Sequence, residues 1–442
     1  MNLPEGFITS IKELPGVDSD SFLRAMEEAP AVGVRLNPAK TCTRFDGEKE
    51  VAWCRSGRYL AERPQFTLMP ELHAGAFYVQ DPSSMIHQRI IAQIATRGTT
   101  LLDLCAAPGG KTTACLSSLP EDCVAVANEV VPARARILQE NLRKWGRPDV
   151  IVTSAAASEL GRLQGKFDII VADVPCSGEG MMRKDEEARR QWNPGLTQQC
   201  ATLQREIIAD ILPALAPGGW LVYSTCTFNI KENEENVRYF IEEYGLESVA
   251  IDVDASWGIG QSLDPHIHAL RFMPHLTRGE GLFVTLLRKP YDGAVARSAH
   301  GKPARPEKTA AAEWVKPQYN VYRFGTKLRA MSTACASLLS DIEGIKSAIL
   351  DAGTEIGEVK GRDIVPSAAL PLSGTYRPGA FPEREVTEAE ALSFLRREPL
   401  VLPNETPKGY VIITYKGLRL GIVKNLGNRT NNLYPKEWRV RI

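Results

Sequence analysis

Between residues 71 and 290 the chain alternates between short apolar runs and longer amphipathic segments. The apolar runs have the length and composition of strands, whereas the segments between them repeat apolar positions with the period of an α-helix. The predicted strands are Thr100–Leu104, Val124–Ala127, Val150–Val152, Phe167–Ala172 and Trp220–Ser224, and the clearest predicted helices are Pro132–Lys144 and Thr197–Leu215. Strands that alternate with helices indicate an α/β fold built on a doubly wound parallel sheet, with a ligand crevice at the carboxyl ends of its strands.

The pattern changes on the N-terminal side of this region. Residues 1–70 place a predicted helix, Ser19–Glu28, before a predicted strand, Val32–Leu36, and an Asn-Pro pair follows the strand. We therefore expect a small α/β module at 1–70, followed by the main domain at 71–290.

The C-terminal side also departs from the alternation. Residues 291–312 are rich in Ala, Gly, Pro, Lys and Arg and show no apolar period, which is typical of a linker. Beyond it we expect a connecting subdomain at 313–378 and a β-rich domain at 379–442. The second of these should hold a hairpin, because two strand-like runs, Tyr410–Thr414 and Leu418–Val423, flank a Lys-Gly turn.

Composition narrows the class of protein. The 442 residues carry a formal net charge of zero and are 43% hydrophobic, as in ordinary soluble globular proteins. The nine cysteines are widely spaced and form no C-x-x-C pair, which favours reduced thiols over a zinc ribbon or a disulfide scaffold. The chain shows no apolar run of membrane length and no signal peptide, so we expect a cytoplasmic protein with no membrane or metal partner. Since no repeat or coiled-coil pattern calls for assembly, we expect a monomer.

Basic residues gather near the C-terminus even though the whole chain is neutral. From residue 406 onward only Glu437 is acidic, and the basic residues are Lys408, Lys416, Arg419, Lys424, Arg429, Lys436, Arg439 and Arg441. Such a cluster can contact the phosphates of a nucleic acid, although a solvated lysine-rich surface has the same composition.

The first chemical signal lies where the first predicted strand ends. The segment Cys105 to Lys111 reads CAAPGGK and leads into a helix. Gly109 and Gly110 allow a tight turn and a close approach of backbone to ligand, and the free N–H groups of the helix face the crevice. After the second strand, about 20 residues beyond the glycines, Glu129 stands where a carboxylate can accept hydrogen bonds from ribose hydroxyls.

A second signal lies at the ends of the fourth and fifth predicted strands. Asp173 and Cys176 follow the fourth strand in the sequence ADVPCSG, and Cys226 follows the fifth in YSTCTF. In the predicted topology these strand ends lie side by side, so both thiols and the carboxylate face one crevice. A free cysteine is often only a small buried hydrophobe, but two at one crevice suit covalent catalysis by a thiolate.

Taken in this order, the motifs resemble the Nol–Nop–Sun family of RNA (cytosine-5)-methyltransferases. The resemblance covers about residues 70 to 290 and rests on CAAPGGK at 105–111, DVPC at 173–176 and STC at 224–226, with YVQDPSS at 78–84 ahead of them. It is strongest with a bacterial branch that acts on small-subunit ribosomal RNA, because NRTNNLYP at 428–435 is similar to the PUA-like tail of that branch. The implied fold is a Rossmann-like S-adenosylmethionine methyltransferase sheet with a PUA-like RNA-binding domain.

The resemblance implies a role for each residue. The segment Cys105, Ala106, Ala107, Pro108, Gly109, Gly110 and Lys111 would wrap the methionine part of S-adenosylmethionine, and Glu129 would hold its ribose. Asp173 would lie between cofactor and target base with Lys111 nearby. Cys226 would add to carbon 6 of the cytosine, which makes carbon 5 nucleophilic, and Cys176 would help release the adduct. One position departs from the family: Ala156, after the third strand, replaces an aspartate that lies near the adenine.

Three alternatives remain at this stage. A DNA cytosine methyltransferase would use a Pro-Cys motif and make Cys176 the nucleophile. The RNA could be transfer RNA instead of ribosomal RNA. The chain could also be a non-catalytic RNA-binding assembly factor on the same fold. The sequence does not name the target cytidine, how many cytidines are modified, or whether the substrate is free RNA or an assembled subunit.

Overall fold

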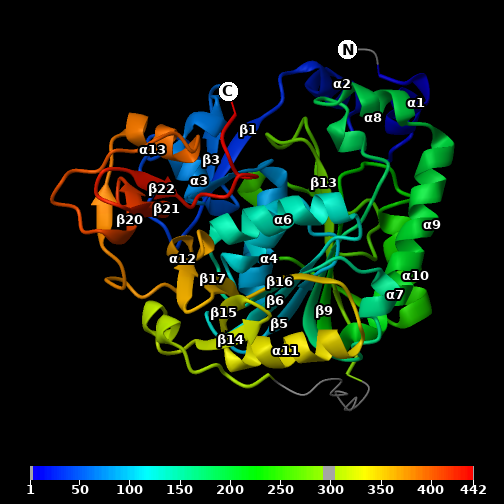
Figure 1. The fold of residues 1–442 in the computed structure, drawn as a ribbon. Coiled ribbons are helices and arrows are strands. Elements are labelled where there is room, and N and C mark those ends of the chain that lie inside the picture. Colours follow the sequence, from blue (N-terminus) through cyan, green and yellow to red (C-terminus); the bar gives the residue numbers. More distant parts are fainter. Residues whose placement is uncertain (1–2, 292–303, 442) are drawn as a thin grey trace.

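The central element is one large mixed sheet with helices on both faces, seen in a computed structural model that describes residues 3–291 and 304–441 (Figure 1). Its middle consists of five parallel strands in the order β9-β8-β5-β6-β7. They are β5 (Thr100–Asp103), β6 (Val124–Asn128), β7 (Val150–Thr153), β8 (Phe167–Asp173) and β9 (Leu215–Thr225). The chain runs outward from β5 in one direction and then returns to β8 on the other side, so the predicted doubly wound sheet is confirmed.

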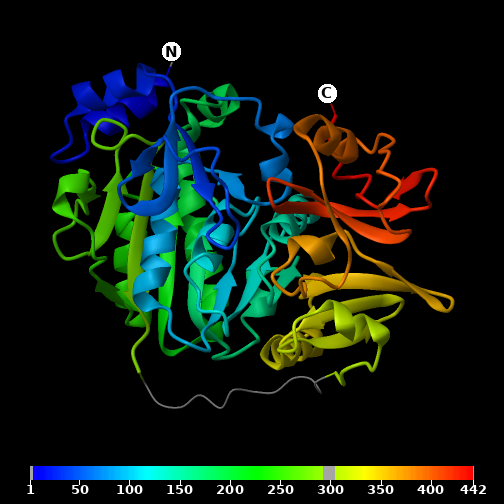
Figure 2. The same ribbon diagram turned by 90° about the vertical axis from the view of Figure 1, so that its left-hand side faces the viewer.

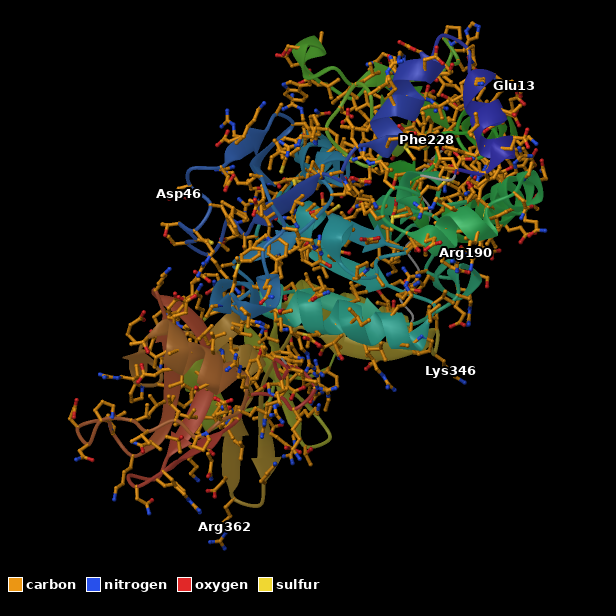
Figure 3. The ribbon with its side chains drawn as sticks, turned by 90° about the horizontal axis from the view of Figure 1, so that it is seen from above. Glu13, Asp46, Arg190, Phe228, Lys346 and Arg362 are labelled. Atoms are coloured by element: carbon orange, nitrogen blue, oxygen red, sulfur yellow. The ribbon has the colours of Figure 1, made fainter. Side chains whose placement is uncertain are left out.

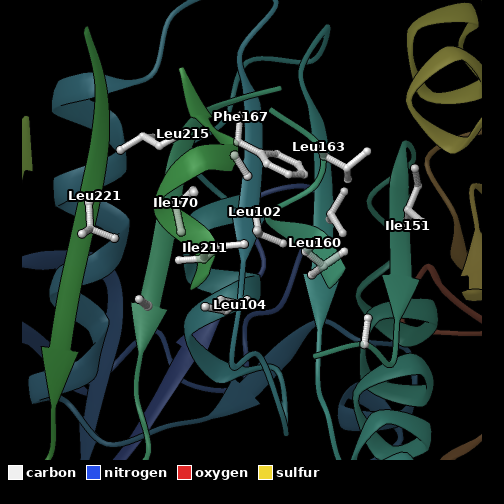
Figure 4. Packing of buried hydrophobic residues seen from close by; sticks show 14 of the residues in the cluster. Leu102, Leu104, Ile151, Leu160, Leu163, Phe167, Ile170, Ile211, Leu215 and Leu221 are labelled. Atoms are coloured by element: carbon white, nitrogen blue, oxygen red, sulfur yellow. The ribbon is translucent and has the colours of Figure 1, made fainter. Parts of the chain in front are cut away.

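Alternate side chains of these strands enter two separate cores. On one face, residues such as Leu102 and Ile170 pack against helices α7 (Ala157–Leu160), α9 (Pro194–Ile211), α10 (Glu234–Tyr244) and α11 (Thr333–Gly344) (Figure 4). On the other face, residues such as Leu101 and Val171 pack against α4 (Ile86–Ile94), α5 (Gly110–Leu116) and α6 (Pro132–Trp145). Strands buried on both sides read as continuous apolar runs, which is why the sequence pattern reveals them.

Both edges of the sheet carry antiparallel strands that were not predicted. Beyond β9 lie β13 (Leu282–Arg288), β12 (Ala269–Phe272) and β11 (Gly260–Gln261), and β10 (Glu247–Val249) also pairs with β13. At the opposite edge β16 (Ile349–Ala352) pairs with β7. Because β16 comes from the segment expected to be a connecting subdomain, that segment completes the central sheet.

The N-terminal region packs onto the main domain. Its sheet has the order β2-β3-β1-β4, formed by β1 (Val32–Leu36), β2 (Lys49–Val51), β3 (Cys54–Leu60) and β4 (Phe77–Val79), so it reaches past residue 70. Helices α1 (Glu5–Lys12) and α2 (Ser19–Glu27) precede the sheet. The rings of Phe22 and Phe228 pack edge-on with their centroids 4.9 Å apart, and those of Phe7 and Trp192 pack edge-on with their centroids 5.7 Å apart. Both helices therefore lie against the loops that follow β8 and β9 (Figure 3).

The C-terminal region lies beside the β7 edge of the sheet (Figure 2). One small sheet contains β14 (Asn320–Phe324), β15 (Lys327–Met331), β17 (Thr354–Lys360) and β18 (Asp363–Pro366), and α12 (Ala369–Leu372) follows. The last sheet contains β19 (Glu383–Glu385), β20 (Gly409–Tyr415), β21 (Leu418–Asn425) and β22 (Thr430–Asn432), with α13 (Glu388–Leu395) packed on it. The predicted hairpin is confirmed, because β20 and β21 are joined at Lys416 and Gly417, which both have positive φ.

The expected linker at 291–312 is only partly visible. Residues 292–303 lie outside the described residues. Near its C-terminal end a short 3-10 helix, Ala310–Trp314, buries Ala311 completely. The structure therefore attaches this end of the expected linker to the C-terminal region.

An ion cluster fixes β16 to the main domain. Asp351, in β16, accepts from Nε of Arg143 in α6 at 2.5 Å and is also paired with Arg329 in β15. Glu355 lies 3.1 Å from the same Arg143. Since Asp351 is only 5% exposed, these charges join the two parts of the chain away from water.

Candidate active site

The candidate residues meet at the carboxyl ends of the parallel strands. Asp103 ends β5, Asn128 ends β6 and Asp173 ends β8. In the pairing of β8 with β9, Asp173 lies opposite Ser224, and Cys226 follows one residue after the end of β9. Parallel pairing therefore brings together residues that are far apart in the sequence, at the edge where doubly wound sheets bind their ligands.

The segment from Cys105 to Lys111 forms a turn that is anchored from neighbouring elements. Gly109 is the N-cap of α5 and has a φ of 114°, a conformation that favours glycine. The carbonyl of Ala107 accepts from Arg134 at 3.0 Å, and that of Pro108 accepts from Asn141 at 2.8 Å. Both donors lie on α6, so this helix holds the turn in place.

Glu129 is almost fully buried at the start of the loop before α6. It is 3% exposed, and Oε1 accepts from the backbone N–H of Val131 at 3.0 Å. Its Oε2 lies 3.3 Å from the guanidinium of Arg134. Ala156 is the N-cap of α7, and its methyl side chain makes no cap bond and offers no polar group to a ligand.

Asp173 and Lys111 form an ion pair in the crevice. Nζ of Lys111 donates to Oδ2 of Asp173 at 2.7 Å. Burial by itself would lower the pKa of Lys111, but the carboxylate of Asp173 outweighs this and raises the pKa above its usual value. Lys111 therefore stays charged and holds one oxygen of the carboxylate in a fixed position.

The two cysteines touch each other. Sγ of Cys176 lies 3.2 Å from Sγ of Cys226, at the ends of two adjacent strands. The hydrogen bond to Cys226 raises the pKa of Cys176 well above its usual value, and burial raises it further. Cys176 therefore keeps its proton and can donate it to the sulfur of Cys226.

Two buried carboxylates, which sequence reasoning missed, fix the loops that carry these cysteines. Glu179 accepts from the backbone N–H of Phe228 at 2.7 Å and from Nε1 of Trp192 at 3.0 Å. Glu232 accepts from the backbone N–H of Ser177 at 3.0 Å. These bonds tie the loop after β8 to the loop after β9, so the distance between the two sulfurs depends on them. Their only sequence signal is an acid close to each cysteine motif.

Asp103 is a third acid that the sequence reasoning did not single out. It is fully buried, and burial raises its pKa to about 7. Its Oδ2 accepts from Thr112 at 2.6 Å, whereas its Oδ1 has no hydrogen-bond partner among the described residues. An unpaired carboxylate oxygen costs free energy unless a further donor reaches it, so a polar ligand beside the glycine turn fits this site.

The described residues contain no group of three or more His, Cys, Asp or Glu side chains suited to a metal ion. No helix in 3–291 or 304–441 is long and apolar enough to span a membrane.

Three family models match the chain in succession. The family model described as 16S rRNA methyltransferase RsmB/F matches residues 93–288. The N-terminal domain of 16S rRNA methyltransferase RsmF matches residues 3–82, and the methyltransferase RsmF PUA domain matches residues 381–440. The expected PUA-like character of the C-terminal domain is thus confirmed.

Curated relatives resemble the chain over nearly its full length. A protein named ribosomal RNA small subunit methyltransferase F from Cronobacter sakazakii is 29% identical, covering 98% of this chain and 96% of its own length. The protein of the same name from Shewanella loihica is 28% identical, and the match covers 99% of this chain and 95% of the relative's own length.

Solved structures share the fold of the main domain. A methyltransferase homolog from Pyrococcus horikoshii has a TM-score of 0.54 and 27% identity, over 64% of this chain and 94% of its own. A structure described as NSun6 from Pyrococcus horikoshii with SFG has a TM-score of 0.56 at 20% identity, over 65% of this chain and 99% of its own, which shows the fold alone. The three successive family matches and the curated relatives show that the chain is similar along nearly its whole length to RsmB/F methyltransferases, and that its N-terminal and PUA domains are similar to those of RsmF.

Proposed function

We propose that this protein transfers a methyl group from S-adenosylmethionine to carbon 5 of a cytidine in RNA, and that the RNA is that of the small ribosomal subunit. The contact between Cys176 and Cys226, 3.2 Å apart beside Asp173, carries the proposal. Two thiols and an acid at one crevice match a reaction that forms and then breaks a covalent bond to the base. The curated relatives that match nearly the whole chain support ribosomal RNA as the substrate.

The cofactor would be held at the ends of β5 and β6. The turn from Cys105 to Lys111 would enclose its methionine part, and Glu129 would accept hydrogen bonds from its ribose. The unpaired Oδ1 of Asp103 beside this turn fits a ligand that brings its own donors. When bound, S-adenosylmethionine supplies an electrophilic methyl group. Ala156 offers no carboxylate to the adenine, so that end of the cofactor would be held less tightly.

Cys226 would act on the base as the nucleophile. Its thiolate adds to carbon 6 of the cytosine, and the electrons of the ring shift toward nitrogen 3 and carbon 5. Asp173, fixed by Lys111 at 2.7 Å, would bond the polar edge of the base and favour protonation of nitrogen 3. The ring then carries a nucleophilic carbon 5.

Cys176 would act after methylation. While Cys226 is free, the hydrogen bond between the two sulfurs holds the pKa of Cys176 high. Once the sulfur of Cys226 is bonded to carbon 6, it can no longer be a thiolate, and this cause of the raised pKa disappears. Cys176 can then lose its own proton to water, and its thiolate accepts the proton of carbon 5. The electrons of that carbon–hydrogen bond restore the 5,6 double bond, and the sulfur of Cys226 leaves carbon 6 as a thiolate.

The PUA-like domain would position the RNA. Its hairpin carries Lys416, Arg419 and Lys424, which are suited to phosphate contacts. Phosphate contacts fix where the RNA lies, whereas the crevice must receive an unpaired or flipped base.

Covalent trapping tests the assignment of the two cysteines. Wild type, Cys176→Ser and Cys226→Ser are mixed with S-adenosylmethionine and unmodified small-subunit ribosomal RNA, and denaturation-resistant protein–RNA adducts are measured. We expect Cys176→Ser to accumulate the adduct and Cys226→Ser to form none. Trapping by Cys226→Ser would reverse the roles, and the absence of methylation by wild type would refute the activity on this RNA. Transfer RNA in a parallel reaction tests the other RNA substrate.

A further inference from the structure

The two cysteines of the crevice are close enough to react with each other. All nine cysteines of the chain are free thiols in this structure, and Cys176 and Cys226 are the only two that hydrogen-bond to each other among the residues that the structure describes. A disulfide holds its sulfurs about 2.0 Å apart, so bonding requires an approach of about 1.2 Å from the observed 3.2 Å.

The loops that carry the pair are joined on both sides of it. Before the cysteines, the backbone N–H of Val174 donates to the carbonyl oxygen of Ser224 at 3.1 Å. Directly after them, Oγ of Ser177 and Oγ1 of Thr227 lie 3.0 Å apart. Because the loops already run side by side through the pair, rotation of the side chains brings the sulfurs together without separating the loops.

Both thiols of the pair are partly exposed, so a small oxidant dissolved in water reaches them. The other partly exposed cysteines are Cys42, Cys105 and Cys200. Burial raises the pKa of all three, which lowers the share of the reactive thiolate in each. The crevice therefore holds the two cysteines that are accessible and also have a partner within reach.

We propose that Cys176 and Cys226 form a disulfide when the protein meets a peroxide, and that this disulfide is a reversible inactive state. The loss of activity rests on the proposed function, because the sulfur of Cys226 cannot add to a cytosine while it is bonded to Cys176. Formation of the bond does not depend on any substrate. The state is reversible, since free thiols reduce a disulfide by exchange.

Hydrogen peroxide is the oxidant, and the reaction consumes one peroxide for each disulfide. The sulfur of Cys226 bonds to one oxygen of the peroxide, the oxygen–oxygen bond breaks, and the other oxygen leaves as water with the thiol proton. This oxidation removes the hydrogen bond to Cys226, which is the largest cause of the raised pKa of Cys176. The sulfur of Cys176 then attacks that of Cys226, and the hydroxyl group of the sulfenic acid leaves as a second water with the proton of Cys176. The two sulfurs together lose two electrons, which the peroxide gains.

Mass spectrometry of the full chain tests the bond without any RNA. The protein is treated with hydrogen peroxide, its remaining thiols are blocked in denaturant, and the chain is digested without a reductant. We expect a cross-linked peptide pair that contains Cys176 and Cys226 and that dithiothreitol separates. Cys200→Ser is the matched control and should form the same bond, because it removes a partly exposed thiol on α9. A free Cys176 after this treatment, or a bond from either cysteine to another one, would overturn the proposal.

The variant Cys176→Ser tests whether Cys176 is the partner. Without a second thiol, the sulfenic acid on Cys226 is oxidised further to a sulfinic acid, which dithiothreitol does not reduce. We expect this variant to keep two added oxygen atoms at Cys226 after reduction, whereas wild type returns to its original mass. Complete recovery of the original mass in the variant would contradict the role of Cys176.

Methyl transfer tests the inactive state. The treated protein is freed of peroxide and assayed with S-adenosylmethionine and small-subunit ribosomal RNA transcribed in vitro. We expect the initial rate to fall by the same fraction as the protein that carries the disulfide, and to return with dithiothreitol. An unchanged rate in disulfide-bonded protein would overturn the inactive state. Inactivity of untreated wild type would refute the proposed function on this RNA, and the bond measured by mass would remain a separate result.

Discussion

The pairing of β16 with β7 predicts that Asp351→Asn destabilises the main domain and not only the C-terminal region. Asp351 is 5% exposed and neutralises Arg143 and Arg329, which are 22% and 10% exposed. Its substitution leaves both guanidinium groups with Glu355 as their remaining carboxylate. Removing one partner of a buried ion pair costs about 3–5 kcal/mol. The asparagine keeps one acceptor oxygen, so we expect a loss near the lower end, about 3 kcal/mol.

The pH dependence of this contribution has a definite sign. The two arginines outweigh burial, which alone would raise the pKa, and hold the pKa of Asp351 below its usual value. Its stabilisation is therefore complete above the usual pKa of an aspartate and is lost as the pH falls through the lowered value in the folded protein. Near pH 7 wild type has the full contribution, and the difference from Asp351→Asn should be at its largest.

Urea unfolding and thermal unfolding, both followed by tryptophan fluorescence and far-ultraviolet circular dichroism, measure the loss of stability. A loss of about 3 kcal/mol corresponds to a melting temperature lower by roughly 6–12 °C for a part of this size. Glu186→Gln is the matched control, because it removes an ion pair with Arg190 in which both side chains are 67% exposed, worth about 0–1 kcal/mol. A change in Asp351→Asn no larger than in Glu186→Gln would refute the reasoning. So would early unfolding of the C-terminal region with an unchanged transition of the main domain.

The remaining predictions concern the crevice. Burial raises the pKa of Asp103 to about 7, so its contribution to stability is complete below pH 4 and is lost as the pH rises through 7. The melting temperature of wild type should therefore fall between pH 4 and 7 because of this group, and Asp103→Asn should remove that part of the fall. Glu179→Ala leaves the N–H groups of Phe228 and Trp192 without their acceptor, at about 1–3 kcal/mol each, and should slow methyl transfer by more than about tenfold while calorimetry shows unchanged cofactor binding. Glu129→Ala should weaken S-adenosylmethionine binding by about 10–150-fold in the same calorimetric assay, and unchanged affinity would contradict its assignment to the ribose. Ala156→Asp should raise thermal stability, as an N-cap for α7 worth about 1 kcal/mol, and tighten cofactor binding; a gain in stability alone would mean that the carboxylate does not reach the adenine.

The sequence was most informative where one segment determines its own structure. The five parallel strands are doubly buried, so each appears as an apolar run. The hairpin was predicted from a Lys-Gly turn between two strand-like runs, and in the structure both turn residues have positive φ. The cysteines and Asp173 were expected at one crevice, because parallel strands end at a common edge. The structure places them there, and their chemical roles remain proposals.

The features that could not be predicted from the sequence depend on contacts between distant segments. Strand β16 is only four residues long, and its partner β7 lies far away in the chain, so no local pattern reveals the pairing. His87 has an ordinary position on an apolar helix, and only the fold brings it to Ser224. The expected boundary at residue 70 divides a sheet whose last strand, Phe77–Val79, is too short and too near the next motif to be assigned from its pattern.

Because β16 is synthesised long after β7, the edge of the central sheet stays unpaired during translation. The ribosome must add about 200 residues after β7 before β16 can pair with it, which takes roughly 10–40 s at typical rates of bacterial synthesis. During this time the outer edge of β7 presents unpaired backbone N–H and C=O groups, which are a template for association with other chains. The nascent main domain therefore has an open edge that only its own later sequence can close, and chaperone binding should be greatest in this interval.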